Sequence, residues 1–124
     1  MRVTFDNEKS IYIQIAEAIK DDILKDIMEE ETQIPSTTQM AVTYRINPAT
    51  AAKGVNLLVD EGIIYKKRGI GMFVVSGAKE AIRETRKKEF YDSYIAAMLD
   101  EARKLGISTR DIIKMIESGE EKHE

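Results

Sequence analysis

The sequence predicts a mainly α-helical protein that contains one small β-hairpin. Three observations support this fold class. Aliphatic residues recur at spacings of three and four over residues 10–28, an asparagine-proline pair opens an alanine-rich stretch at residue 47, and the hydrophobic period changes to two after residue 62. The chain has 124 residues, of which 43% are hydrophobic, and this suits one compact domain with an appended segment.

The first helix is predicted over residues 10–28. Charged residues separate six aliphatic residues there, and these form one face that is expected to pack on a core: Ile11, Ile15, Ile19, Ile23, Leu24 and Ile27. The acidic run at 29–31 interrupts the pattern and is interpreted as a solvated loop. Ser36 is expected to cap a short second helix over about 37–44, because Pro35 keeps the preceding residue out of helical geometry and a serine hydroxyl accepts a backbone amide.

The third helix is predicted to start at an asparagine-proline pair. Asn47 is expected to be its N-cap and Pro48 its first residue, because proline has no amide hydrogen to lose at that position. The helix is expected to run to about Glu61, where Gly62 can adopt the left-handed conformation that ends it. Its apolar positions suit a buried face, and its remaining positions form a polar face with Thr50, Lys53 and Asn56.

A β-hairpin is predicted next, because the apolar period is two from here on. Its strands are expected at residues 63–67 and 72–75, and the basic, glycine-bearing segment 68–71 is expected to form the turn. Ser76 and Gly77 then form a joint between two parts of the chain. The predicted domains are therefore residues 1–76 and 77–124.

The C-terminal part is predicted to consist of two helices. A long helix over 78–105 ends at Gly106, Ser108 caps a last short helix, and the charged tail 118–124 is expected to fray. Two helices alone cannot bury the wide apolar stripe of the long one, so a partner chain is expected. The stripe could also pack within the chain or line a ligand site. The predicted dimer interface consists of Phe90, Tyr91, Tyr94, Ile95, Met98, Leu99 and Leu105.

Charge and composition exclude several classes of function. The formal net charge is -3, yet residues 36–76 hold five basic residues against two acidic ones, a balance of +3. With no cysteine and one histidine, at position 123, neither a metal site nor histidine-based catalysis is expected. No glycine fingerprint opens a helix, so neither an enzyme nor a bound cofactor is expected. No run of about 18 apolar residues is present, so no membrane contact is expected and a cytoplasmic location is predicted.

The order of the elements indicates a winged helix-turn-helix. Three helices are followed by a two-stranded hairpin, with a tight link between the second and third helices. A capped helix start brings short side chains and a positive dipole end to phosphates and base edges, and a basic hairpin tip can reach the neighbouring backbone or minor groove. The predicted architecture is a winged helix-turn-helix followed by a two-helix dimerisation segment.

Residues 11–74 resemble the DNA-binding domain of the GntR family of bacterial transcription regulators. Five short motifs occur in the family's order. They are IYIQIA at 11–16 (I-Y-x-Q-I-A in the family), IPS at 34–36 (L-P-S), INPAT at 46–50 (V-N-P-N-T), LLVDEGII at 57–64 (L-x-x-E-G-x-I) and RGIGMFV at 68–74 (R-G-x-G-x-F-V). The short helical C-terminal part is similar to that of the YtrA subfamily, in which it pairs two subunits.

The resemblance implies which residues contact DNA. The chain departs from the family at Thr38, where arginine is typical, at Ile70, where a polar residue is common, and at Ala49 and Ala52, which occupy positions that are often polar. The candidate DNA-contacting residues lie at the start of the second helix, in the following turn, at the start of the third helix and at the hairpin tip: Ser36, Thr37, Thr38, Gln39, Arg45, Asn47, Pro48, Ala49, Thr50, Lys53, Lys67, Arg68, Gly69, Ile70 and Gly71.

The function that the resemblance implies is sequence-specific transcription regulation. A dimeric repressor is expected to read a pseudo-palindromic operator with its third helix and wing, and transporter genes are among the targets that the subfamily suggests. The expected partners are double-stranded operator DNA and a second copy of the chain, and an unidentified small-molecule effector is left open. The alternative is a winged-helix protein-interaction module without specific DNA binding, which the acidic net charge favours.

Overall fold

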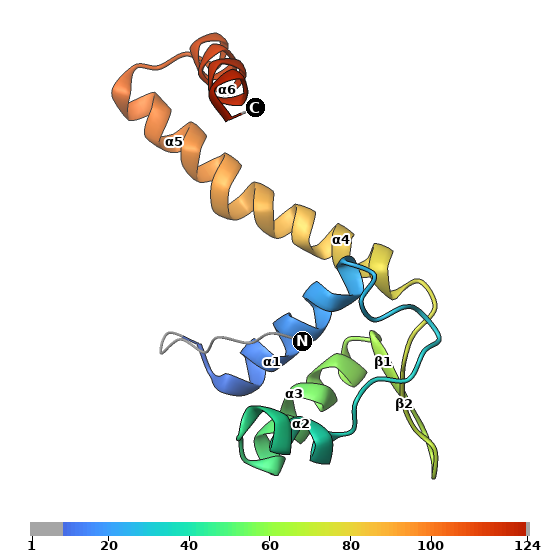
Figure 1. The fold of residues 1–124 in the computed structure, drawn as a ribbon. Coiled ribbons are helices and arrows are strands. Elements are labelled where there is room, and N and C mark those ends of the chain that lie inside the picture. The colour runs from blue at the N-terminus through green and yellow to red at the C-terminus, as the bar shows by residue number, and fades with distance from the viewer. Residues whose placement is uncertain (1–8, 124) are drawn as a thin grey trace. The chain divides into compact units, whose positions relative to one another are not determined.

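The computed structural model describes residues 9–123. The elements, in chain order, are α1 (Ile11–Leu24), α2 (Thr37–Tyr44), α3 (Pro48–Asp60), β1 (Ile64–Lys67), β2 (Gly71–Val74), α4 (Ala78–Phe90), the π-helix η1 (Tyr91–Ile95), α5 (Ala96–Leu105) and α6 (Thr109–His123) (Figure 1). This confirms the predicted fold class, mainly α-helical with one small β-hairpin. Internal contacts divide the chain into unit 1, which ends at Glu84, and unit 2, which begins at Thr85.

The core of unit 1 lies where α1 packs on α3. Ile15 and Ile19 of α1 and Val55 of α3 have no exposed surface. The two helices approach closely at Gly54, because a Cβ atom there would lie 2.8 Å from the carbonyl oxygen of Tyr12. Glycine is therefore the residue that this helix crossing requires.

α1 ends earlier than the sequence predicts. The chain leaves the helix after Leu24 and turns through Asp26, which has a φ of 61°. The amides of Ile27 and Met28 both donate to the carbonyl of Asp22, at 2.9 and 3.1 Å, and close this turn. The prediction that Ile27 faces the core is wrong, since the turn leaves this side chain 63% exposed.

The predicted helix starts are confirmed. The hydroxyl of Ser36 accepts the amide of Gln39 at 3.1 Å, and the side-chain oxygen of Gln39 accepts the amide of Ser36 at 2.8 Å, so α2 begins with a reciprocal capping box. At α3 the side-chain oxygen of Asn47 accepts the amide of Ala49 at 2.8 Å, and Pro48 is the first helical residue. The Asn47 cap borders the turn between α2 and α3, and the Ser36 cap lies at the other end of α2.

The hairpin differs slightly from its predicted bounds. β1 and β2 are antiparallel, and the register runs from Ile64 opposite Val74 to Lys67 opposite Gly71. The second strand thus begins at Gly71, one residue before its predicted start, and ends one residue before its predicted end. The first strand begins one residue after its predicted start. Gln33, in the connection between α1 and α2, forms a further bridge with the second strand that the sequence did not predict.

The acidic run at residues 29–31 is an exposed loop, as predicted, but its carboxylates also bond to other elements. The carboxylate of Glu31 accepts the amide of Ser76 at 3.1 Å and the hydroxyl of Tyr65 at 2.8 Å. The hydrogen bond to Glu31 raises the pKa of the Tyr65 phenol above its ordinary value. Glu31 therefore connects the α1–α2 segment to β1 and to the joint that follows β2.

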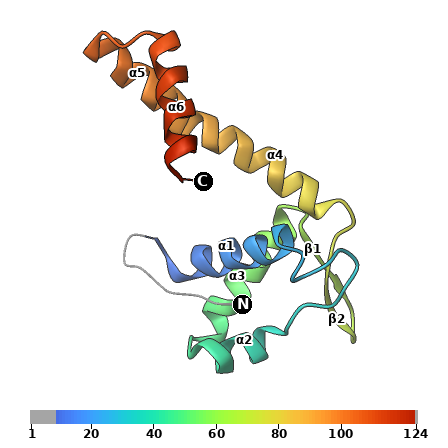
Figure 2. The ribbon, with the colours of Figure 1, turned by 45° about the horizontal axis from the view of Figure 1, so that its top comes forward.

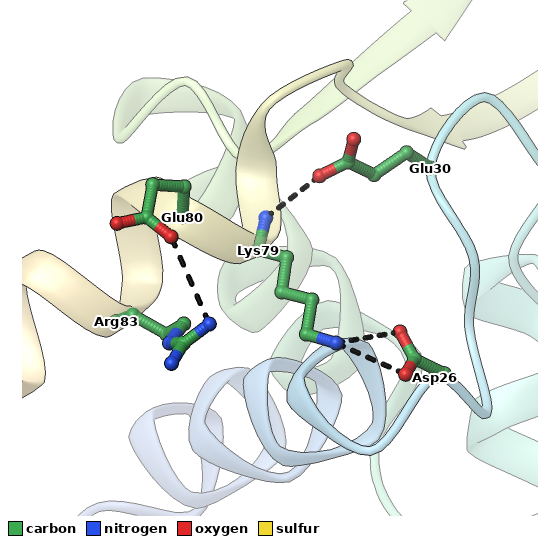
Figure 3. Close-up of polar contacts among 5 residues, drawn as sticks. All are labelled: Asp26, Glu30, Lys79, Glu80 and Arg83. Carbon is green, nitrogen blue, oxygen red and sulfur yellow. Dashed lines mark hydrogen bonds and ion pairs between the residues drawn. The ribbon is translucent and has the colours of Figure 1, made fainter.

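The first turn of α4 is held by two other acidic side chains of the same segment (Figure 3). The carboxylate of Glu30 accepts the amide of Lys79 at 3.0 Å, and the ammonium of Lys79 lies 3.0 Å from both carboxylate oxygens of Asp26. Backbone hydrogen bonds from Gly77 and Lys79 hold the pKa of Glu30 below its ordinary value. These contacts fix where the chain leaves the hairpin.

Two predictions about the C-terminal part need correction. The predicted long helix at 78–105 is interrupted by the π-helical turn at Tyr91–Ile95. The predicted frayed tail is wrong over residues 118–123, because α6 continues to His123. Glutamate and lysine are strong helix formers, and no proline interrupts this stretch. Among the described residues, no helix is both long and apolar enough to cross a membrane.

Candidate nucleic-acid interface

The predicted DNA-contacting residues gather at one end of unit 1. In both ribbon views the turn between α2 and α3, the start of α3 and the tip of the hairpin lie at the same end of this unit (Figures 1 and 2). Most of the predicted contact residues are exposed, and Thr37, Thr50 and Gly71 are half-buried. The fold thus presents to solvent the segments that the sequence singled out, although their contact with DNA stays a prediction.

The start of α2 carries short, uncharged polar side chains. The hydroxyl of Ser36 and the side-chain oxygen of Gln39 are used in the capping box. Thr38 is exposed and lines a shallow hollow together with Val42 and Thr43. This part of the surface carries hydroxyl and methyl groups rather than charge.

A strained residue connects α2 to α3. Arg45 ends α2 in the left-handed conformation, with a φ of 53° and a ψ of 47°, and its side chain is exposed. Residues other than glycine adopt this conformation at a cost of about 1 kcal/mol. Asp26 and Glu31 also have positive φ, so the conformation alone assigns no role to Arg45, and its contact with DNA stays a prediction.

The exposed cation of α3 rests on an aromatic ring of α1. The ammonium of Lys53 lies 4.2 Å from the centroid of the Tyr12 ring. The contact is a cation–π interaction that holds the lysine side chain along the α1–α3 surface. Sequence reasoning selected Lys53 but missed Tyr12 as its partner, since the two residues are 41 positions apart in the printed sequence.

One cation of the hairpin, Lys67, also lies over an aromatic ring. The rings of Tyr65 and Phe73 stack across the two strands at 5.7 Å, and the ammonium of Lys67 lies 4.5 Å from the centroid of Phe73. The ammonium of Lys66 is turned the other way and donates to the side-chain oxygen of Asn56 in α3, at 2.8 Å. Lys67 and the exposed Arg68 therefore supply the positive charge near the hairpin tip.

Unit 2 leaves most of its large apolar side chains exposed. Within the described part of this unit, Ala102 and Ile112 are the buried hydrophobic residues. Of the predicted dimer residues, Ile95, Met98 and Leu99 are half-buried. The others are more than half exposed: Phe90 by 56%, Tyr91 by 53%, Tyr94 by 66% and Leu105 by 64%.

An apolar groove runs between α5 and α6. It has a volume of about 390 Å³. Methionine, leucine, isoleucine and alanine side chains form nearly all of its lining, which consists of Met98, Glu101, Ala102, Leu105, Ile107, Ile112, Met115 and Ile116. The sequence predicted the apolar face of α5 but not the contribution of Met115 from α6.

Residues 11–74 match the family model described as bacterial regulatory proteins of the gntR family. The HTH-type transcriptional regulator YurK of Bacillus subtilis is 31% identical over 85 residues, which are 67% of this chain and 35% of YurK. The repressor YtrA of the same organism is 36% identical over 74 residues, 60% of this chain and 57% of YtrA. The regulator YhcF, also from B. subtilis, is 24% identical over 116 residues, 92% of this chain and 93% of YhcF. The chain thus spans most of YhcF but much less of the other two relatives.

Solved structures agree with these relatives. A putative transcriptional regulator of the GntR family from Bacteroides thetaiotaomicron is 39% identical, has a TM-score of 0.80, and covers 93% of this chain and all of its own. BusR of S. agalactiae, solved in complex with its busAB promoter DNA, is 30% identical with a TM-score of 0.57, over 92% of this chain and 51% of BusR. The relatives are transcription regulators rather than enzymes, as the sequence predicts. The chain therefore belongs to the GntR family of bacterial regulatory proteins, and residues 11–74 form its DNA-binding, winged-helix part.

Proposed function

We propose that the protein is a dimeric transcription repressor that occludes a promoter by binding a pseudo-palindromic operator. The observation that carries this proposal is the shared position of the α2–α3 turn, the start of α3 and the hairpin tip at one end of unit 1 (Figures 1 and 2). An α-helix fits the major groove, and a hairpin beside it can reach the adjacent backbone. Transporter genes stay among the proposed targets, and a cytoplasmic location stays a prediction.

The proposed DNA contacts are of two kinds: contacts with bases, which select the sequence, and contacts with phosphates, which position the protein. The start of α3 carries Asn47, Ala49 and Thr50, and its amides and positive dipole end suit phosphates and base edges. The basic side chains of unit 1 that are proposed to neutralise phosphates are Arg45, Lys53, Lys67 and Arg68. Contacts of this kind fix the orientation on the duplex, while the short side chains of α3 select the sequence.

The proposed dimer uses the C-terminal segment at 77–124, and residues 1–76 are the proposed DNA-binding domain. The exposed aromatic and aliphatic side chains of unit 2 support a dimerising role for this segment, because burying them against a second copy would remove apolar surface from water. A second copy that covers them would place two DNA-binding domains on half-sites one or more helical turns apart, about 34 Å or a multiple. The groove between α5 and α6 is the proposed place for the partner's apolar side chains or for an unidentified effector.

Alanine variants of the basic residues test the proposal against the alternative of a protein-interaction module. Binding of a fluorescein-labelled duplex from upstream of the protein's own gene is measured by anisotropy for Lys53→Ala, Lys67→Ala and Arg68→Ala. Each is expected to weaken binding and to flatten the salt dependence by about 0.9 units per lost phosphate contact. The control is Lys88→Ala, which removes an exposed lysine of α4. Unchanged binding by all three variants would favour the interaction module.

A further inference from the structure

The π-helical turn η1 holds one residue more than a turn of α-helix. The amide of Ala96 donates to the carbonyl of Tyr91, five positions back, where an α-helix would use the carbonyl four positions back. The α-helices α4 and α5 continue directly on either side of the turn. Turns of this kind are rare in proteins and occur frequently at functional sites. The extra residue changes how the side chains before the turn align with those after it.

The extra residue aligns the two halves of the apolar stripe in unit 2. In an uninterrupted α-helix, residues eight positions apart lie about 80° apart around the axis, because each residue turns the helix by about 100°. When the π turn absorbs one residue, that angle falls to about 20°. Phe90 and Met98 are one such pair, and Tyr91 and Leu99 are another. The aromatic side chains thus lie in line with the aliphatic face of α5.

This alignment extends the groove between α5 and α6. Met98 lines the groove, and Tyr94 and Phe90 lie about one and two turns before it on the same side of the helix. The rings of Phe90 and Tyr94 contact each other, with their centroids 5.4 Å apart, and both side chains are more than half exposed. The aromatic pair and the groove therefore form one continuous apolar surface.

A second copy of the chain is the occupant that the charges along this surface favour. Lys87 lies three residues before Phe90, Glu101 lies three residues after Met98, and both side chains are exposed. Each of the two charges is seven positions from Tyr94, so a two-fold axis near Tyr94 places Lys87 of each copy opposite Glu101 of the other. Within its own helix Glu101 lies 3.8 Å from Lys104, and an exposed ion pair of this kind costs little to rearrange.

We propose that η1 sets the register of the dimer surface. Its extra residue brings the aromatic pair and the groove-lining face of α5 to one side of the helix, where a second copy packs in antiparallel orientation. The inference rests on the proposed function and deepens it by naming the side chains that must lie in line. It also gives a role to Asp92 and Ser93, which lie outside the predicted stripe and supply length rather than contacts.

Deletions in η1 test the register by sedimentation velocity on the full chain. Deleting Ser93 is expected to leave the protein dimeric, because a continuous α-helix without this residue has the alignment that the π turn provides. The melting temperature is expected to rise, since an α-helical turn replaces the rarer π turn. Deleting both Asp92 and Ser93, or inserting an alanine after Ser93, rotates the aromatic pair by about 100°. These two variants are expected to raise the dimer dissociation constant about 100-fold or more.

Two controls separate register from other effects. Ser93→Ala removes the side chain but keeps the length of the turn, and it is expected to stay dimeric. Deleting the exposed Thr85 turns the preceding part of α4 by about 100° without changing the alignment within residues 86–105, and it is also expected to stay dimeric. Circular dichroism shows whether each variant keeps its helix content, so that loss of the dimer is not mistaken for unfolding.

A charge exchange tests the antiparallel pairing. Glu101→Lys is expected to weaken the dimer about tenfold at low salt, because it places two cations together at both ends of the pair. Combining it with Lys87→Glu is expected to restore the affinity. If the double variant dimerises no better than Glu101→Lys, the antiparallel pairing is overturned.

Failure of this inference differs from failure of the proposed function. A dimeric original protein that becomes monomeric without Ser93, or that stays dimeric without both Asp92 and Ser93, would overturn the role of η1 and leave the repressor proposal intact. If the original protein itself sediments as a monomer, the proposed dimer fails and the role of η1 fails with it.

Discussion

At the scale of the residue, Glu30 links the stability of the α4 attachment to pH. Its carboxylate accepts backbone amides at the start of α4, and these hydrogen bonds lower its pKa from the model-compound value of 4.5. A carboxyl group whose pKa is lowered by folding stabilises the folded state fully above 4.5 and loses that effect as the pH falls through the lowered value. The attachment of α4 is thus expected to weaken in acid.

Glu30→Gln tests this expectation. The variant is expected to melt at a lower temperature than the original protein at pH 7, because a neutral amide is a weaker acceptor than a carboxylate. The difference is expected to shrink as the pH falls below 4.5. Glu29→Gln is the matched control, since Glu29 is a neighbouring exposed glutamate. A difference that stays constant from pH 7 into acid would show that Glu30 does not act through its charge.

Substitution of Arg45 is expected to have opposite effects on the stability of the protein and on its affinity for DNA. Arg45→Gly is expected to raise the free energy of unfolding by about 1 kcal/mol, because glycine adopts the left-handed conformation without strain. The same change is expected to weaken DNA binding and to lower its salt slope by about 0.9. Chemical denaturation and anisotropy measure the two effects.

Arg45→Asn is the companion variant, because asparagine tolerates the left-handed conformation better than most residues and carries no charge. It is expected to lose the same DNA affinity as Arg45→Gly with a smaller gain in stability. DNA binding unchanged in both variants would remove Arg45 from the interface.

At the scale of the element, the crossing of α1 and α3 depends on the absence of a side chain at Gly54. Alanine favours a helix over glycine by about 1 kcal/mol, yet here its Cβ would lie 2.8 Å from a backbone carbonyl of α1. Gly54→Ala is therefore expected to destabilise the protein by about 1 to 3 kcal/mol in urea denaturation, because α1 must move away.

Gly119→Ala is the matched control in α6. A Cβ atom there would have no heavy atom within 4 Å, so the variant is expected to stabilise its helix by about 0.5 to 1 kcal/mol. Opposite signs for the same substitution in two helices would support the packing of α1 on α3. A stabilising Gly54→Ala would contradict it.

Some boundaries and contacts of the elements could be predicted from the sequence, and others could not. The starts of α2 and α3 were predictable, because Ser36 and Asn47 act on amides within three residues of themselves. The end of α1 was not, since the aliphatic spacing continues to Ile27 although the chain leaves the helix after Leu24 and turns at Asp26. The bond from Gln33 to Ile70 spans 37 positions and that from Ser76 to Glu31 spans 45, so only the folded chain reveals them.

The candidate interface follows the same rule. Its segments were predictable because family motifs and caps are local. The positions of its lysine side chains were not predictable, because the rings that Lys53 and Lys67 contact belong to another helix or to the facing strand. Tertiary contacts of this kind decide where a long cationic side chain lies, and neither composition nor periodicity encodes them.

At the scale of the whole molecule, the exposed apolar surface of unit 2 is the feature that supports the proposed dimer. Its large apolar side chains more than half exposed also include Ile113, Met115 and Ile116 of α6. Surfaces of this kind are typical of subunit interfaces. The proposed dimer covers them and pairs two DNA-binding domains.

Tyr94→Asp is expected to convert the dimer to a monomer in sedimentation velocity, because a buried, unpaired carboxylate opposes association. Loss of the second DNA-binding domain is expected to lower operator affinity by about 100-fold. Ser93→Asp adds the same carboxylate one position away, outside the predicted stripe, and is expected to remain dimeric. A Tyr94→Asp variant that stays dimeric would contradict the proposed interface.

Binding by a dimer to a specific operator is tested most directly by the affinity and stoichiometry of the purified protein on the duplex upstream of its own gene. Fluorescence anisotropy compares that duplex with a scrambled one of equal length over a range of salt concentrations. Binding to the upstream duplex is expected to be tighter by about 10³ or more, with two chains on each duplex. Equal affinity for both duplexes, or binding by single chains, would contradict a dimeric repressor of the protein's own promoter.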